Sequence, residues 1–131
     1  MKLLLDTHIW LWSLLEPTKL SRRVLRELES KKNELWLSPI SIWELLILHE
    51  RGRVVLKENI VTWVGKATTT VPLHEAPITH EIALETRTIR LPHQHPADRF
   101  LSATAKVFEL TLVTADERLM GVKDCKVLAN R

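Results

Sequence analysis

Short apolar runs alternate along the chain with segments whose apolar residues recur at helical spacing. The apolar runs predict buried strands at 2–5, 35–37, 110–113 and 126–128, with a further extended piece at 70–73. Helical periodicity predicts helices over 9–15, 21–32, 40–51, 58–68 and 79–90, a helix of about three turns leading to the strand at 110, and a helical turn at 117–120. This alternation predicts an α/β fold around a small, mostly parallel sheet.

The segment 40–51 is apolar on most sides and follows a helix start at Ser38-Pro39. We therefore expect this helix to be largely buried, with Trp43 in the core and Trp36 in the core beside it. Glu44 is the acidic exception. A buried acid is costly unless it is paired, hydrogen-bonded or bound to a metal.

Three further acids stand next to predicted strands or helix starts. Asp6 and Asp116 each follow an apolar strand, and Asp98 opens the helix that leads to the second of these strands. Glu44 lies one turn into the helix after the strand at 35–37. Because ligands bind beyond the carboxyl ends of the strands in such sheets, we expect all four acids to gather at one edge.

Each acid also has a purely structural interpretation. Asp6 and Asp116 can cap the elements that follow them, Asp98 can complement a helix dipole, and the motif Ser41-Ile-Trp-Glu44 matches a capping box. Together, however, four neighbouring carboxylates repel one another unless a divalent cation holds them, and oxygen ligands suit Mg²⁺ or Mn²⁺. The joint pattern favours a metal site.

Composition limits the classes of protein. The 131 residues fit one domain, 1–131, and 45% apolar with 27% charged residues is typical of a soluble globular protein. The N-terminus lacks the apolar segment of a signal peptide or membrane span, so we expect a cytoplasmic protein without a membrane partner. Cys125 is the only cysteine, which excludes an internal disulfide and a cysteine metal site.

The net charge of +3 comes from 19 basic and 16 acidic residues. Taken alone, it indicates only a mildly basic surface. If four acids gather in one pocket, the rest of the surface becomes more strongly basic, and a negative pocket inside a positive rim suits a phosphodiester chain held by metal ions.

Four motifs resemble those of the PIN-domain family, in the small form found in VapC toxins: LLLDTH, SIWELLIL, HPADRFLSATA and LTLVTAD. The resemblance covers essentially the whole chain, in the family's order and spacing. It implies a three-layer PIN-like fold and a metal-dependent endoribonuclease that acts as the toxin of a toxin-antitoxin pair. It also implies a homodimer and a cognate antitoxin protein that silences the toxin.

Carried over residue by residue, the resemblance makes Asp6, Glu44, Asp98 and Asp116 a quartet that binds one or two Mg²⁺ or Mn²⁺ ions. In the family such a site activates a water to attack the RNA phosphorus. Thr114 matches a polar position that often supports the site, and Thr7 is a second candidate for such a role.

Three positions keep more than one interpretation. Many relatives carry an acid where this chain has His95, which can be a loop residue, a neutral metal ligand or a phosphate contact. Arg99 can contact phosphate or form a structural ion pair. Trp10 and Trp12, two apart on a helix, cannot share a face, so one should reach the surface as a dimer, antitoxin or RNA contact.

Two other functions are consistent with acids at strand ends. One is a PIN-like nucleic-acid-binding module without catalysis, which would require a defective site, yet all four acids are present. The other is a phosphoacceptor domain of receiver type. That class expects two neighbouring acids after the first strand, whereas Asp6 is followed by Thr7-His8.

Overall fold

The computed structural model describes residues 1–92 and 95–131, so residues 93 and 94 of the loop predicted at 91–95 lie outside the described residues. The strands are β1 (Lys2–Leu5), β2 (Glu34–Leu37), β3 (His74–Glu75), β4 (Thr111–Thr114) and β5 (Lys126–Ala129). The α-helices are α1 (Thr7–Leu15), α2 (Arg22–Glu29), α3 (Pro39–Glu50), α4 (Ile60–Ala67), α5 (His80–Glu85) and α6 (Pro96–Val107). Short 3₁₀-helices span Pro17–Lys19, Thr86–Thr88 and Glu117–Leu119.

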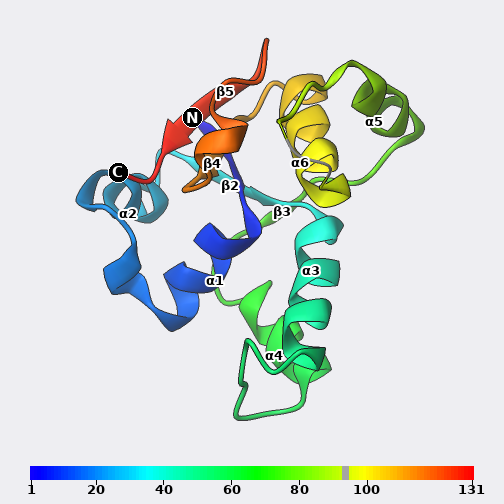
Figure 1. Ribbon diagram of the computed structural model, residues 1–131. Coiled ribbons are helices and arrows are strands. Elements are labelled where there is room, and N and C mark those ends of the chain that lie inside the picture. The colour runs from blue at the N-terminus through cyan, green and yellow to red at the C-terminus, as the bar shows by residue number, and fades with distance from the viewer. Residues whose placement is uncertain (93–94) are drawn as a thin grey trace.

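The strands form one sheet in the order β3-β2-β1-β4-β5, and each pairing of neighbours is parallel (Figure 1). In the centre, Leu3 of β1 lies opposite Leu35 of β2 and Thr111 of β4. The ladder continues one residue past β1, where the Asp6 amide donates to the Val113 carbonyl at 3.0 Å. The carboxyl ends of β1 and β4 are therefore neighbours.

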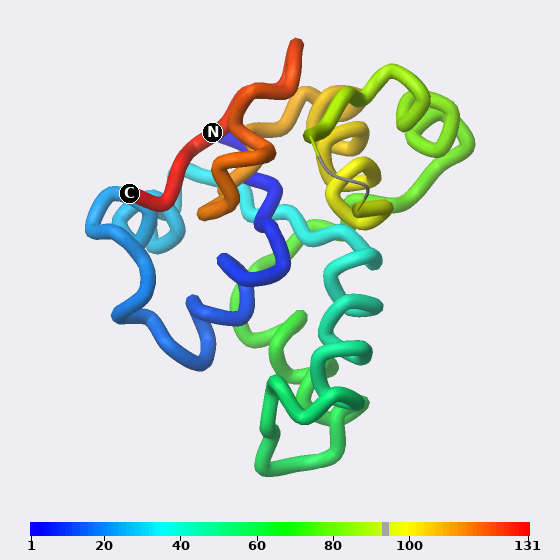
Figure 2. Tube along the Cα trace, in the orientation of Figure 1, coloured from blue at the N-terminus to red at the C-terminus, as the bar shows by residue number. Residues whose placement is uncertain are grey.

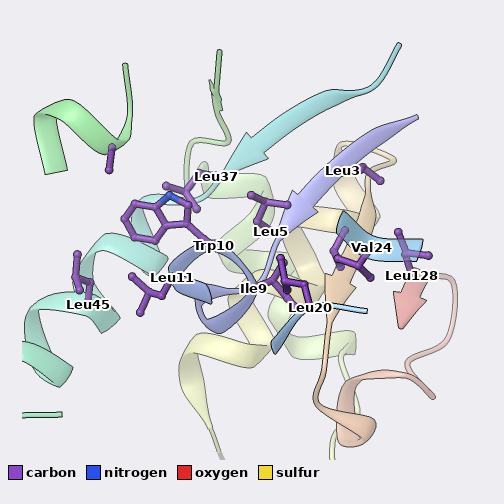
Figure 3. Close-up of a cluster of buried hydrophobic side chains, with 12 residues drawn as sticks. Leu3, Leu5, Ile9, Trp10, Leu11, Leu20, Val24, Leu37, Leu45 and Leu128 are labelled. Carbon is purple, nitrogen blue, oxygen red and sulfur yellow. The ribbon is translucent and has the colours of Figure 1, made fainter. Parts of the chain in front are cut away.

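Side chains of β1 point alternately to the two faces of the sheet, and helices cover both faces. Leu3 and Leu5 join a core cluster with residues of α1 and α2, such as Ile9 and Val24 (Figure 3). Leu4 instead packs in a cluster with Leu101 of α6. Burial on both faces explains why the strands read as continuous apolar runs, and it confirms the predicted three-layer α/β arrangement.

Two predicted elements differ from the structure. The extended piece predicted at 70–73 is mostly turn, and the strand β3 begins only at His74. Pro72 has no backbone N–H to give to a ladder, so pairing starts after it. The helix predicted over 79–90 ends at Glu85 and continues as a 3₁₀-helix.

Helix α3 is much less buried than predicted. It leads away from the end of β2 beyond the sheet (Figure 2), and only Ser41 and Leu45 in it are fully buried. Trp43 is 49% exposed, so its predicted core position is wrong. Trp36 is half-buried, stacked on the His74 ring at 4.8 Å between centroids. Apolar composition alone did not reveal that Trp43 and Leu46 on this helix would be exposed.

None of the helices within residues 1–92 and 95–131 is long and apolar enough to cross a membrane.

Candidate active site

The four predicted acids line one pocket at the carboxyl edge of the sheet. Asp6 follows β1, and Asp116 follows β4 two residues after its last residue. Asp98 lies in the first turn of α6, which begins beside the start of α3, the helix that carries Glu44 (Figure 1). The pocket has a volume of about 330 Å³, and all four carboxylates border it. The structure therefore brings together the residues that the sequence singled out.

Both carboxylate oxygens of Asp6 accept hydrogen bonds from the chain. Its side chain is buried, with Oδ1 accepting from the Thr7 amide at 2.7 Å and Oδ2 accepting from the Thr114 hydroxyl at 2.6 Å. Burial raises the pKa of Asp6 to about 6; the Thr114 hydrogen bond opposes the rise, and the charges of Asp98 and Glu44 add to it. The carboxylates of Asp98 and Glu44 therefore interact electrostatically with that of Asp6.

Threonine hydroxyls support two of the carboxylates. The Thr114 hydroxyl donates to Asp6 and accepts from the Asp116 amide at 3.0 Å, so it ties the ends of β1 and β4 together. The Thr7 hydroxyl donates to Glu44. Because Thr7 has one hydroxyl hydrogen, the Ser41 hydroxyl, 2.9 Å away, must donate to Thr7 in turn. Both threonines lie where a supporting role requires them.

The remaining two acids lie beside basic side chains. His95 Nδ1 is 3.5 Å from Asp98 Oδ2, and the imidazole lines the pocket. Arg118 donates two hydrogen bonds to Asp116, from Nε to Oδ1 at 3.1 Å and from Nη2 to Oδ2 at 2.9 Å. His95 therefore lies beside the acids, and its role as a loop residue, a neutral metal ligand or a phosphate contact stays a prediction.

Some of the structural interpretations coexist with the pocket. Asp6 caps α1 and Asp116 caps the 3₁₀-helix 117–119, where it accepts from the Arg118 amide. The capping box at Ser41 is wrong, because α3 begins at Pro39 and its cap is Ser38. Glu44 is only half-buried, so the argument from a fully buried acid does not apply to it. Glu44 lines the pocket and accepts from the Thr7 hydroxyl.

Arg99 does not reach the pocket. Its Nη2 donates to the Thr86 carbonyl at 2.8 Å, and the side chain lines a separate cavity with Thr86, Pro96 and Phe100. Neighbouring residues on a helix point in different directions. Asp98 of α6 therefore faces the acidic pocket, while Arg99, the next residue, faces the separate cavity.

Sequence reasoning missed His8, Ala115 and Arg118 in the pocket wall, and it considered Trp12 only as one of two tryptophans that could reach the surface. His8 and Trp12 are four apart on α1 and so share a helix face, which was a usable signal. Arg118 lies two residues beyond Asp116, a spacing without a specific meaning until the 3₁₀-helix is known.

The pocket offers carboxylate oxygens, which are the ligands that Mg²⁺ and Mn²⁺ prefer. Within the described ranges, no group of three or more His, Cys, Asp or Glu side chains is arranged to hold a metal ion. Glu44 is turned toward Thr7 and Asp116 toward Arg118. The carboxylate oxygens fit the ligand preference of a divalent cation.

Comparison with known proteins shows which family this chain matches. The model of the PIN domain matches residues 3–124. Ribonuclease VapC22 of Mycobacterium tuberculosis (strain ATCC 25618 / H37Rv) is 34% identical over 119 residues, covering 88% of this chain and 88% of that protein.

Solved structures share the fold. VapBC2 from Rickettsia felis, bound to a promoter DNA fragment, aligns with a TM-score of 0.75 at 17% identity, covering 98% of each chain. A toxin-antitoxin complex from Klebsiella pneumoniae aligns with a TM-score of 0.64 at 20% identity, covering 98% of this chain and 97% of that one.

Proposed function

The chain belongs to the PIN-domain family, and on that premise we propose that it is a metal-dependent endoribonuclease acting as the toxin of a toxin-antitoxin pair. The observation that carries this proposal is the meeting of four carboxylates in one pocket, where Asp98 and Glu44 contribute to the raised pKa of Asp6. Such mutual repulsion is what a divalent cation offsets. The similarity to a protein named a ribonuclease supports RNA as the substrate.

Asp6, Glu44, Asp98 and Asp116 would hold one or two Mg²⁺ or Mn²⁺ ions. When bound, such an ion supplies a nucleophile at neutral pH and offsets the charge that develops on the phosphate. Within the chain, Thr114 and the Thr7 amide fix both oxygens of Asp6, so this carboxylate keeps its orientation before any ion arrives.

Two of the other carboxylates already have partners in the chain. Glu44 accepts from the Thr7 hydroxyl and Asp116 is paired with Arg118, and each carboxylate has further lone pairs that would bind the ion. The guanidinium of Arg118 lines the same pocket and would pair with a phosphate oxygen. His95, beside Asp98, is a further candidate for a phosphate contact or a neutral ligand.

The proposed partners are an antitoxin protein and a second copy of this chain. The fold shared with the Klebsiella pneumoniae toxin-antitoxin complex supports the first. The homodimer is proposed from the resemblance to VapC toxins and can be checked by light scattering.

The receiver-type alternative is disfavoured by topology. Receiver domains of the flavodoxin-like type order their strands 2-1-3-4-5, whereas this sheet runs β3-β2-β1-β4-β5. A catalytically silent nucleic-acid-binding module shares the fold, so only an activity assay separates it from the proposed enzyme.

RNA cleavage provides that test. Purified protein is incubated with mixed cellular RNA in Mg²⁺, Mn²⁺ or EDTA, beside Asp98→Asn. The matched control is Asp124→Asn, an exposed acid outside the pocket at φ 61°, a conformation that Asn tolerates. We expect wild type and the control to cleave equally with metal, EDTA to stop both, and Asp98→Asn to lose on the order of 1,000-fold. Equal cleavage by Asp98→Asn, or cleavage in EDTA, would overturn the proposal.

A further inference from the structure

Trp12 borders the acidic pocket without being part of the acidic cluster. It lies on α1, one helical turn after His8, and both side chains line the pocket with the four acids. Their rings are 5.8 Å apart between centroids and tilted by 53°. An aromatic wall thus stands beside the carboxylates.

The packing role of α1 is carried mainly by a different tryptophan. Trp10 is 2% exposed within the core cluster (Figure 3), and it meets Trp63 edge-on at 5.8 Å between ring centroids. Trp12 is half-buried and packs against that core from outside it. Core packing alone therefore does not account for a large aromatic ring that reaches the pocket.

Basic side chains lie near this aromatic wall. The Lys19 ammonium, which is not part of the pocket lining, lies 5.5 Å from the centroid of the Trp12 ring and is paired with Glu16 at 2.8 Å. The arginine Arg118 lines the pocket itself. Aromatic rings and basic side chains thus occur together around the pocket, as they do on surfaces that bind single-stranded nucleic acid.

The chemistry of the pocket creates a need for such a wall. Four carboxylates repel the phosphates of RNA, so contacts with uncharged parts of the RNA add binding free energy that the carboxylates do not oppose. A base that stacks on an aromatic ring supplies it, and every base has a π-face, so stacking tolerates any sequence. Interactions with non-reacting parts of a substrate also position the reacting centre.

We propose that Trp12, with His8 beside it, is the stacking platform for an unpaired RNA base next to the phosphate that the acids address. This inference rests on the proposed function, and it names a binding feature of the same site. Because stacking requires an open base face, the platform selects single-stranded over duplex RNA.

The test measures binding apart from cleavage. Fluorescein-labelled random RNA octamers are titrated by anisotropy in Mn²⁺ against Asp98→Asn protein, which should not cleave. In this background, Trp12→Leu keeps an apolar contact with the core but removes the aromatic face, and Trp12→Phe restores a smaller ring. The matched control is Trp43→Leu, an exposed tryptophan of α3 that does not line the pocket.

We expect Trp12→Leu to weaken octamer binding by about 5- to 150-fold, Trp12→Phe to recover most of the loss, and Trp43→Leu to change it less than about twofold. An abasic ribose-phosphate octamer should bind Asp98→Asn and its Trp12→Leu derivative equally, and duplex RNA should show no dependence on Trp12. A purely packing role would lower the melting temperature without this difference between the octamers.

The outcomes separate the two proposals. Unchanged octamer binding in folded Trp12→Leu would overturn the stacking platform, whether or not the wild type cleaves RNA. If Trp12-dependent binding appears while the wild type fails to cleave RNA with any metal, the platform stands and the proposed enzyme does not.

Discussion

The two sides of the pocket hold their carboxylates by different means. On the hydroxyl side, Asp6 and Glu44 accept from threonine hydroxyls. On the basic side, Asp98 and Asp116 lie beside His95 and Arg118. Hydroxyls orient a carboxylate without neutralising it, whereas a guanidinium offsets its charge. If the proposed metal site is correct, the hydroxyl side would offer the ion two carboxylates whose charge is not offset by a basic side chain, whereas Asp116 already lies beside a cation.

The largest expected effect comes from removing one charge on each side. Asp6→Asn and Asp116→Asn should each lower metal-dependent RNA cleavage on the order of 1,000-fold, because each removes a proposed ligand. Their metal-free stabilities should diverge at pH 7. Asp6→Asn removes a buried, repelled charge and should raise the melting temperature. Asp116→Asn breaks a solvent-exposed ion pair with Arg118, whose side chain is 56% exposed, and should lower the melting temperature only slightly. Melting temperatures that shift in the same direction in Asp6→Asn and Asp116→Asn would contradict the proposed difference between the two sides of the pocket.

The pH dependence of unfolding gives the next largest effect. The pKa of Asp6 is raised to about 6 by burial, above the 3.8 of the free side chain. Between these values the folded protein holds a proton that the unfolded chain has lost, so stability falls as pH rises from about 4 to 6, by about 3 kcal/mol from this group.

Denaturant unfolding in EDTA across this pH range measures that loss, and Asp6→Asn should remove its Asp6 component. Mn²⁺ should restore more stability at pH 7 than at pH 5, because ionised Asp6 is the ligand. Identical pH profiles of stability for wild type and Asp6→Asn would show that the pKa of Asp6 is not raised by folding.

Removing the hydroxyl that orients Asp6 should have an intermediate effect. Thr114→Val keeps the shape of the side chain but loses both hydrogen bonds, and cleavage should fall about 10- to 100-fold. Thr114→Ser should restore most of the activity. Thr104→Val serves as control, since this buried hydroxyl donates to the Phe100 carbonyl at 2.7 Å within α6. An equal loss in both valine variants would indicate general destabilisation instead.

The smallest effect is expected on the basic side. Arg118→Gln frees Asp116 from its ion pair, so Mn²⁺ should bind up to about fivefold more tightly by calorimetry. Arg131→Gln, which removes an exposed arginine paired with Glu117, should leave the affinity unchanged. Weaker Mn²⁺ binding by Arg118→Gln would mean that the arginine positions Asp116 rather than competing for it.

Sequence reasoning located the acids because parallel strands end at a common edge. Asp6 and Asp116 follow neighbouring strands, and this geometry holds whatever covers the sheet. It failed where tertiary packing decides which side of a helix is covered: Trp43 is exposed on α3, and Arg99 points away from the acids. The position of Glu44 was predicted correctly although its burial was overestimated. For the same reason, the placement of Trp12 on the pocket required the structure.

The central claim is that the four carboxylates together hold a divalent cation, and calorimetric titration with Mn²⁺ tests it most directly. Wild type and Asp124→Asn should bind Mn²⁺ reversibly with equal affinity, and Asp98→Asn should bind at least about 10-fold more weakly. Failure of the wild type to bind Mn²⁺, or equal binding by Asp98→Asn, would contradict the account.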